Sequence, residues 1–234
     1  MPPHEIKAVL FDFMGTCLDW HSSVVAALPM QLDERSQFAL NWRQRYFDSN
    51  AKRVKQSQPP EDFDNTLRAV LLTGDEGSET KALFTPDVID RLIVAWHNQK
   101  AWTDVAPAIE KLRKNGYEVF VHANGTTRLQ LDLCRSSGLQ FHSLFSSELL
   151  GYIKPDLEAY RKGLRLIRRS PDECVMVAAH AYDTRGAKAV GMKIVYVYRW
   201  TDNIHEDQAV VKAEHDAYLN DMNTLVEVIE RLGQ

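Results

Sequence analysis

The 234-residue sequence has only three cysteines, Cys17, Cys134 and Cys174, and they lie far apart. They form no CxxC pair, so the sequence predicts neither a disulfide framework nor a structural zinc site. Isolated cysteines of this kind are usually small buried residues. Because free thiols suit a reducing compartment, we expect a cytoplasmic protein.

An excess of positive charge and a long apolar run are also missing. The formal net charge is −4, which gives no basic field for nucleic acid or for an anionic membrane. No apolar stretch approaches the roughly 18 residues of a membrane-spanning helix. The N-terminal Met-Pro-Pro-His-Glu lacks the basic-then-apolar order of a secretory signal. We therefore expect neither nucleic acid nor a membrane as a partner.

What the sequence does contain is an alternation of strand and helix patterns. The run KAVLFDF at residues 7–13 predicts a buried strand, and further strands are predicted at 117–122, 143–146, 174–179 and 194–198. Helices are predicted at 106–115, 127–136, 156–167, 183–190 and 222–232, with Pro155 in the first turn of the third. This order predicts an α/β fold with a doubly wound, Rossmann-like parallel sheet.

Helical patterns alone fill the stretch between the first strand and residue 101. They cover 22–57, 63–72 and 86–97, separated by breakers rich in Pro and Gly. Because this stretch interrupts the alternation, we expect a helical cap inserted after the first strand. The predicted division is a core of residues 1–18 and 101–234 and a cap of residues 19–100.

Polar side chains follow the predicted strands. Asp12 ends the first strand, Asn124 follows the second, Lys154 precedes a helix, and His180 and Asp183 follow the strand at 174–179. Ligands of open α/β sheets bind beyond the carboxyl ends of the strands, so these groups are predicted to share one crevice. Any one of them, Asp183 above all, could instead be a helix cap.

These residues resemble the motifs of the haloacid dehalogenase superfamily. Asp12-Phe-Met-Gly-Thr-Cys-Leu-Asp19 is similar to its first motif, and Asn124-Gly125, Lys154-Pro155-Asp156 and Asp183 match the later motifs in order. The resemblance implies that Asp12 is an attacking carboxylate. Phosphatases of the superfamily carry a second Asp two residues later, where this sequence has Met14. Met14 cannot protonate a leaving group, a role typically worth about 10²–10⁴ in rate.

The 2-haloacid dehalogenase (type II) branch is therefore the closer resemblance. Its members displace halide from the carbon beside a carboxyl group, form an ester on the enzyme and hydrolyse it with water. Trp42-Arg43-Gln44-Arg45 resembles the cap segment that supplies an arginine, which implies that Arg43 binds halide or substrate carboxylate. The alternative for Arg43 is a solvated ion pair with Asp48.

The resemblance assigns roles to four more residues. Thr16 positions the nucleophile or the substrate, and Lys154 keeps the Asp12 carboxylate charged and aimed. Tyr160 follows Lys154 by six residues, as a substrate-pocket tyrosine does in this branch, although a core tyrosine fits the pattern as well. Met14 is expected to line an apolar part of the pocket.

Three positions depart from the dehalogenase pattern. Ala123 and Ala178 replace expected serines, and His180 replaces an expected asparagine. Backbone N–H groups of Asn124 and Gly125 are expected to bind the substrate carboxylate instead.

His180, with Asp183 three residues on, is predicted to be an oriented general base that hydrolyses the Asp12 ester. The alternative is a histidine satisfied by backbone hydrogen bonds. For His122, a structural role is expected.

The main prediction is hydrolysis of a short 2-haloacid carboxylate to halide and a 2-hydroxy acid, with no obligatory cofactor. One alternative is a hydrolase of the same superfamily that acts on a non-halogenated acid or a phosphate ester, the latter with Mg²⁺ on Asp12 and Asp183. Another is a catalytically silent member that binds a small molecule or partner. The resemblance also implies a cap that gates the pocket and a homodimer.

Overall fold

The computed structural model describes residues 5–74 and 77–234. Six strands form one sheet in the order β5-β4-β1-β6-β7-β8, and every neighbouring pair is parallel. The strands are β1 (Ala8–Phe11), β4 (Glu118–Ala123), β5 (Ser143–Ser146), β6 (Cys174–Ala178), β7 (Lys193–Val197) and β8 (Ala217–Leu219). The predicted doubly wound parallel sheet is confirmed.

Both faces of the sheet are covered, which explains why its strands are apolar throughout. Val9 and Phe11 of β1 belong to a cluster with apolar side chains of α6, α7 and α12, whereas Ala8 and Leu10 pack with those of α9 and α10. The helices of these layers are α6 (Val105–Lys114), α7 (Thr127–Ser137), α8 (Ser147–Leu150), α9 (Leu157–Ile167), α10 (Ala181–Ala189), α11 (Gln208–Glu214) and α12 (Leu225–Leu232), with a 3-10 turn at Pro171–Glu173.

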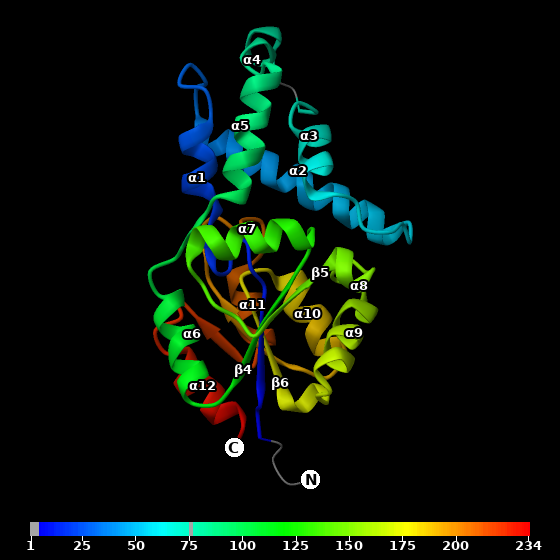
Figure 1. Cartoon of the computed structure of the whole chain (residues 1–234), viewed down its shortest axis with the longest axis vertical. Helices are drawn as coiled ribbons and strands as arrows, with labels where there is room; N and C mark the ends of the chain where they lie inside the picture. The colour runs from blue at the N-terminus through cyan, green and yellow to red at the C-terminus, as the bar shows by residue number, and fades with distance from the viewer. Residues whose placement is uncertain (1–4, 75–76) are drawn as a thin grey trace.

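Five of the described helices, all between residues 20 and 97, lie together beyond the carboxyl ends of the strands (Figure 1). They are α1 (Trp20–Ala27), α2 (Arg35–Lys55), α3 (Phe63–Val70), α4 (Ser78–Ala82) and α5 (Pro86–His97). Trp42 and Trp96 are fully buried between them, with ring centroids 5.3 Å apart. We call this group of helices the helical segment.

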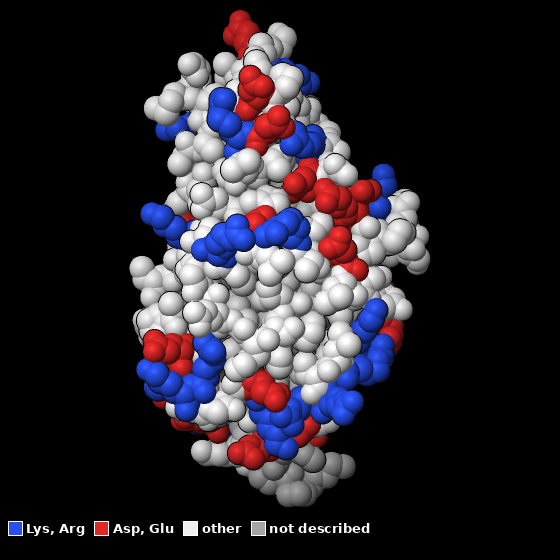
Figure 2. Space-filling view, viewed as in Figure 1, with Lys and Arg blue, Asp and Glu red and all other residues white. Residues whose placement is uncertain are grey.

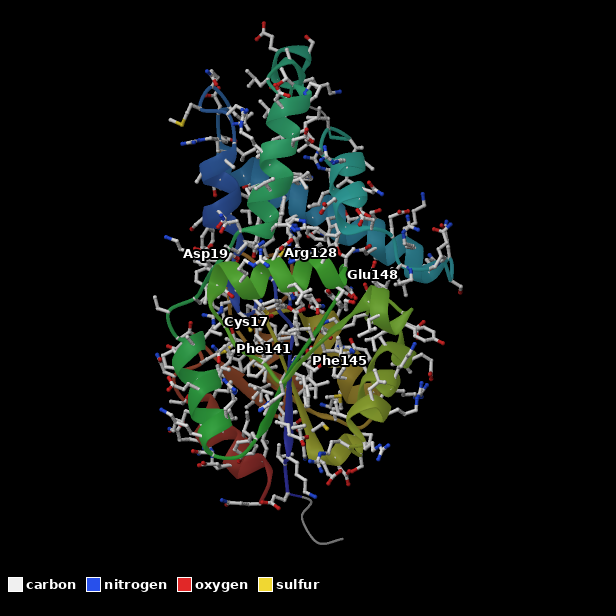
Figure 3. The ribbon with its side chains drawn as sticks, in the orientation of Figure 1. Cys17, Asp19, Arg128, Phe141, Phe145 and Glu148 are labelled. Atoms are coloured by element: carbon white, nitrogen blue, oxygen red, sulfur yellow. The ribbon has the colours of Figure 1, made fainter. Side chains whose placement is uncertain are left out.

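A short antiparallel ribbon stands where the chain leaves and re-enters the sheet domain. It pairs β2 (Leu18–Asp19) with β3 (Lys100–Ala101). Figure 3 shows Cys17 within the sheet domain and Asp19 at the base of the helical segment. Asp19 caps α1 by accepting a hydrogen bond from the Ser22 N–H at 3.0 Å. We propose this ribbon as the boundary between core and cap.

Two local predictions need correction. The helix predicted over 22–57 is divided, since α1 ends at Ala27 and α2 begins at Arg35, with Pro29 between them. Pro155 lies outside α9, because the N-cap is Asp156, whose carboxylate accepts a hydrogen bond from the Glu158 N–H at 2.9 Å.

The surface carries charges of both signs. Figure 2 shows Lys and Arg interspersed with Asp and Glu over the face that it presents. In the described parts of the chain, no helix combines the length and the apolar character needed to cross a membrane.

Candidate active site

Asp12 follows β1 directly and is fixed from several sides. Its backbone N–H donates to the Val177 carbonyl at 3.0 Å, and the residue is only 5% exposed. Oδ2 accepts hydrogen bonds from Thr16 Oγ1 at 2.7 Å and His180 Nδ1 at 3.0 Å, while Oδ1 accepts one from Lys154 Nζ at 3.0 Å. The two carboxylate oxygens therefore differ, because Oδ1 keeps more free acceptor capacity.

Thr16 lies against the carboxylate of Asp12 and is fully buried. Its hydroxyl accepts the Ala179 N–H at 2.8 Å and donates to Asp12, so β6 and the first motif are joined through one side chain. Of the two roles that the resemblance implies for Thr16, this contact favours positioning of the nucleophile.

Lys154 is buried among acceptors. Its ammonium donates to Asp12, to Asp183 and to the His122 carbonyl, the last at 2.7 Å. The Asn124 side chain grips the Lys154 backbone by donating to its carbonyl at 3.1 Å and accepting its N–H at 2.8 Å. The Asn124 side chain thus positions Lys154, a role that differs from the substrate binding predicted for this residue through its backbone N–H.

The Gly125 N–H is also unavailable to a substrate, because it donates to Ser147 Oγ at 2.9 Å. The expected anion site from the backbone of Asn124 and Gly125 is therefore not formed as predicted. Asn124 still lines the cavity described below.

Asp183 lies behind Lys154 and is fully buried. Its Oδ2 accepts the Lys154 ammonium and its Oδ1 accepts the Tyr160 hydroxyl at 2.7 Å. Tyr160 is itself fully buried and is not among the residues that line the cavity, so its expected place beside the substrate is corrected. Tyr160 and Asp183 together hold Lys154 in line with Asp12.

His180 stands between two carboxylates. Nδ1 lies 3.0 Å from Asp12 Oδ2, and Nε2 lies 2.9 Å from Asp202 Oδ1. The side chain that orients His180 is therefore Asp202, which corrects the predicted partner Asp183. The sequence reasoning missed Asp202, although it lies in the loop after β7 and the strand-end rule applied to that strand points to it.

The charges of this group follow from its contacts. Burial alone would raise the pKa of Asp12, but Lys154 and His180 outweigh burial and hold it well below its usual range. Burial would lower the pKa of His180, but Asp12 and Asp202 outweigh burial and raise it to about 9. At neutral pH Asp12 is therefore an anion and His180 a cation.

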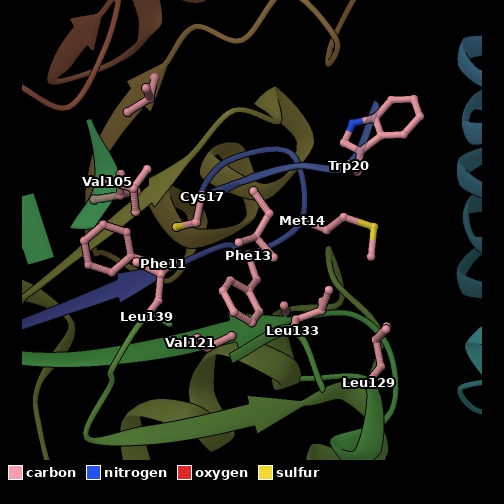
Figure 4. Packing of buried hydrophobic residues seen from close by; sticks show 14 of the residues in the cluster. Phe11, Phe13, Met14, Cys17, Trp20, Val105, Val121, Leu129, Leu133 and Leu139 are labelled. Carbon is pink, nitrogen blue, oxygen red and sulfur yellow. The ribbon is translucent and has the colours of Figure 1, made fainter. Parts of the chain in front are cut away.

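A small cavity of about 30 Å³ adjoins this group. Its lining comes from both parts of the chain: Asp12, Met14, Ala123, Asn124, His180 and Tyr182 from the sheet domain, and Arg43, Tyr46, Phe47 and Phe63 from the helical segment. Met14 lines it as expected, and Figure 4 shows its side chain directed away from the side chains of Phe11, Phe13 and Cys17. Tyr46 and Tyr182 are lining residues that the sequence reasoning missed.

A second cavity of about 360 Å³ lies next to the first. Phe47, Asn124 and Tyr182 line both, so these three side chains separate the small inner cavity from the larger outer one.

Arg43 is turned inward and is 5% exposed. Nη1 donates to the Met14 thioether at 2.9 Å and Nη2 to the Met14 carbonyl at 3.3 Å, while Nε has no hydrogen-bond partner among the described residues. Its guanidinium lies 4.5 Å from the Phe47 ring centroid. The alternative ion pair with Asp48 is not formed, because Asp48 Oδ1 accepts Gln44 Nε2 instead. A thioether is a weak acceptor, so this guanidinium retains donors for an anion.

His122 and Cys17, which the sequence also singled out, make contacts inside the fold and do not line the cavity. His122 is fully buried outside the cavity lining, and its Nε2 lies 3.1 Å from the Ala159 carbonyl. Burial and the nearby Lys154 lower its pKa to about 3, so it is neutral. Cys17 Sγ donates to the Asp12 carbonyl at 3.3 Å, and burial raises the pKa of this thiol.

The donors do not fit a divalent cation as arranged. Lys154 contacts both Asp12 and Asp183, and the Met14 carbonyl accepts Arg43. The phosphatase alternative assigns Asp12 and Asp183 to Mg²⁺, and Lys154 donates to one oxygen of each of these carboxylates, while the other oxygen of Asp183 accepts the Tyr160 hydroxyl. Residues 5–74 and 77–234 contain no cluster of three or more His, Cys, Asp or Glu side chains arranged for a metal.

Comparison with known proteins gives a consistent family. The sequence-family model of the haloacid dehalogenase-like hydrolases matches residues 6–191 of this chain. An (S)-2-haloacid dehalogenase 4A of Burkholderia cepacia is 28% identical over 83% of this chain and 84% of its own length. A solved L-2-haloacid dehalogenase superimposes with a TM-score of 0.79 at 26% identity, covering 95% of this chain and 97% of that one. A glyceraldehyde 3-phosphate phosphatase of Pyrococcus furiosus is 25% identical over 97% of this chain and 94% of its own.

Proposed function

Because this chain belongs to the haloacid dehalogenase-like hydrolases, we propose that it is a 2-haloacid dehalogenase that converts a short 2-haloacid to halide and a 2-hydroxy acid. The observation that carries the proposal is the pairing of an anionic Asp12 with an incompletely bonded Arg43 across one cavity. A carboxylate nucleophile and an anion-binding cation are what displacement of halide requires.

In the first half-reaction, Asp12 attacks the carbon that bears the halogen. A bond forms between Asp12 Oδ1 and that carbon, while the carbon–halogen bond breaks and its electron pair leaves with the halide. Oδ1 is the attacking oxygen in this proposal, because Oδ2 already accepts two hydrogen bonds and Oδ1 only one. Lys154 and Thr16 hold the carboxylate still, so that little reorganisation precedes attack.

In this proposal, the halide and the substrate carboxylate are bound by residues of the helical segment and by Tyr182. Arg43 receives the departing halide, which carries away a full negative charge. Tyr46 and Tyr182 are lining residues whose side chains carry hydroxyl groups, whereas Ala123 carries none. We assign these two hydroxyls to the substrate carboxylate, in place of the serine that the family pattern leads one to expect at 123.

In the second half-reaction, water attacks the carbonyl carbon of the Asp12 ester. His180 is the proton acceptor in this proposal, since Nδ1 lies 3.0 Å from Asp12 Oδ2 and the ring lines the cavity. Asp183 acts through Lys154 and is a positioning residue, because both of its oxygens are occupied and the residue is fully buried.

The alternatives are weaker for stated reasons. A phosphate ester needs a proton donor for its leaving group, and Met14 supplies none. It also needs carboxylate oxygens for Mg²⁺, and Lys154 already contacts both Asp12 and Asp183 here. A silent binding protein gives no account of a buried network of charges, since such networks contribute little to stability by themselves.

The test is halide release from L- and D-2-chloropropionate, chloroacetate and fluoroacetate with EDTA present. We expect release from at least one acid in EDTA, and none from an Asp12→Asn variant that folds normally. Release that needs added Mg²⁺, or hydrolysis of phosphate esters with no halide from any acid, would contradict the proposal.

A further inference from the structure

We propose that Asp202 is a positioning residue for the hydrolytic half-reaction, in which Asp12, His180 and Asp202 form a triad whose base is released when Asp12 becomes an ester. This inference rests on the proposed function. It adds a residue that no sequence motif marked and a reason why His180 serves as a base in one half-reaction only.

The three side chains come from three separate parts of the fold. Asp12 follows β1, His180 caps the start of α10, and Asp202 lies in the loop after β7. The distances are 3.0 Å from Asp12 Oδ2 to His180 Nδ1 and 2.9 Å from His180 Nε2 to Asp202 Oδ1. A nucleophile, an imidazole and a carboxylate that orients the imidazole are the parts of a catalytic triad.

Asp202 is held firmly in this position. Its Oδ2 accepts the Trp20 indole N–H at 3.0 Å and the Thr201 hydroxyl at 2.7 Å, which leaves Oδ1 for His180. Gly15 has a φ of +88°, and a Cβ at this glycine would lie 2.5 Å from Asp202 Oδ1. The first-motif turn therefore leaves room for the Asp202 carboxylate.

The imidazole has few charged neighbours. Asp12 and Asp202 bond its two nitrogens, and the rings of Phe47 and Tyr182 lie 5.1 and 5.6 Å from its centroid. Arg43 Nη2 lies 3.9 Å from Asp202 Oδ1 and is the nearby cation. The charge on His180 is thus set mainly by two carboxylates, of which the reaction removes one.

Ester formation changes the role of His180. In the free enzyme both nitrogens donate to carboxylates, and the cation holds Asp12 in place. When Asp12 Oδ1 is alkylated, its negative charge is lost, and the Nδ1 proton passes to solvent. The proton on Nε2 stays on the ring and remains hydrogen-bonded to Asp202. The neutral ring therefore presents the lone pair of Nδ1 to the cavity.

The hydrolysis then balances. The water oxygen bonds to Cγ of Asp12, and a water proton moves to His180 Nδ1. The Cγ–Oδ1 bond breaks with its electron pair on the departing 2-hydroxy acid, which takes the proton of the new carboxyl group. Asp12 is again an anion and His180 a cation, and one proton has been released for each halide.

The experiment measures the two half-reactions separately with L-2-chloropropionate in EDTA. Rapid-quench halide release reports attack by Asp12, and intact-protein mass reports the ester. The variants are Asp202→Asn, His180→Asn and the conservative Asp202→Glu. Ile229→Val on α12, at a buried residue that does not line the cavity, is a matched control for mild loss of packing.

We expect Asp202→Asn to release about one halide per active site at a rate within tenfold of the wild type. Its ester should then hydrolyse about 10²–10⁴-fold more slowly and accumulate. His180→Asn should do the same, Asp202→Glu should recover part of the rate, and Ile229→Val should not accumulate ester. Because Asp202 raises the pKa of His180, ester hydrolysis in Asp202→Asn should also reach half its plateau rate at a lower pH than in the wild type.

Several results would overturn the triad. One is a folded Asp202→Asn that slows attack and hydrolysis equally, with no ester and an unshifted pH profile, as a purely structural role predicts. Another is rapid ester hydrolysis in folded His180→Asn, which remains informative even if Asp202→Asn does not fold. If the wild type releases no halide from any haloacid, the proposed function itself fails. If the wild type releases halide normally but the Asp202 and His180 variants accumulate no ester, only the triad fails.

Discussion

The two sides of the cavity are built differently. On the sheet side, Asp12, Asp183 and Asp202 have donors on both carboxylate oxygens, and the pairs Lys154–Asp12 and Lys154–Asp183 are almost fully buried. On the helical side, Arg43 has an unpartnered Nε among the described residues and a thioether as one acceptor. The difference indicates that the attacking group is set before substrate arrives, whereas the anion site is completed by the substrate.

Removing Lys154 gives the sharpest test of the sheet side. Lys154→Ala leaves two buried carboxylates without their shared cation, so we expect a loss of about 3–5 kcal/mol in the free energy of unfolding and no halide release. Urea unfolding at neutral pH measures the loss, which should shrink in acid as the carboxylates become protonated. A loss of less than about 1 kcal/mol at neutral pH would show that the network is not strongly coupled.

The corresponding change on the helical side should behave in the opposite way. Arg43→Met breaks a long ion pair of 3.9 Å with Asp202, and that carboxylate keeps the donors Trp20, Thr201 and His180, so the free energy of unfolding should fall by about 1 kcal/mol or less. The value of kcat/KM for halide release should fall by about 10²–10³-fold, because the leaving halide loses its cation. If Arg43→Met destabilises the protein as much as Lys154→Ala does, the contrast between the two sides is wrong.

A third test uses pH. The pKa of His180 is raised from an ordinary 6.5 to about 9 in the folded protein. Its stabilising contribution is therefore fully present below about pH 6.5 and is lost as the pH rises through 9, by about 3 kcal/mol. Urea unfolding between pH 6 and pH 10 should show this decline in the wild type and lack it in His180→Asn. The same decline in both proteins would place its cause in other groups.

Sequence patterns predict most strands and helices of the sheet domain, because local sequence determines its strands and turns. The run Ala8–Phe11 is buried on both faces, and such runs need apolar residues at every position. Asp12, Thr16 and Lys154 could be found because each lies at a fixed offset from a strand end or from a short motif. The division of helices at Pro29 was missed because the surrounding pattern stays helical.

Other parts of the site depend on how distant segments meet. Asp202 is a single Asp in a loop, and only the packing of that loop against Trp20 and Gly15 brings it to His180. Tyr160 has the expected spacing from Lys154, but the orientation of α9 directs its hydroxyl to Asp183. Tyr182 lies one residue before Asp183, and a one-residue step on a helix changes which side chain reaches the cavity.

The smallest predicted change in the free energy of unfolding concerns a contact between the helical segment and the sheet domain that lies outside the cavity. His97 of α5 lies 2.8 Å from Asp64 of α3 and 3.0 Å from Asp132 of α7. These carboxylates raise the pKa of His97, and the largest cause is the hydrogen bond that its ring N–H donates to Asp64. We expect His97→Gln to lower the free energy of unfolding by less than about 1 kcal/mol at pH 6 and by less still above pH 8. Urea titrations at the two pH values check this, and a larger loss at high pH would reverse the sign of the argument.

The central claim is that Asp12 itself becomes esterified, and oxygen labelling tests it most directly. The enzyme is turned over many times on L-2-chloropropionate in heavy-oxygen water, and the peptide that contains Asp12 is analysed by mass spectrometry. Water that attacks Cγ of the ester leaves its oxygen in the enzyme, so we predict a heavy Asp12 carboxylate. An unlabelled Asp12 after many turnovers would mean that water displaces the halide directly, and would contradict this account.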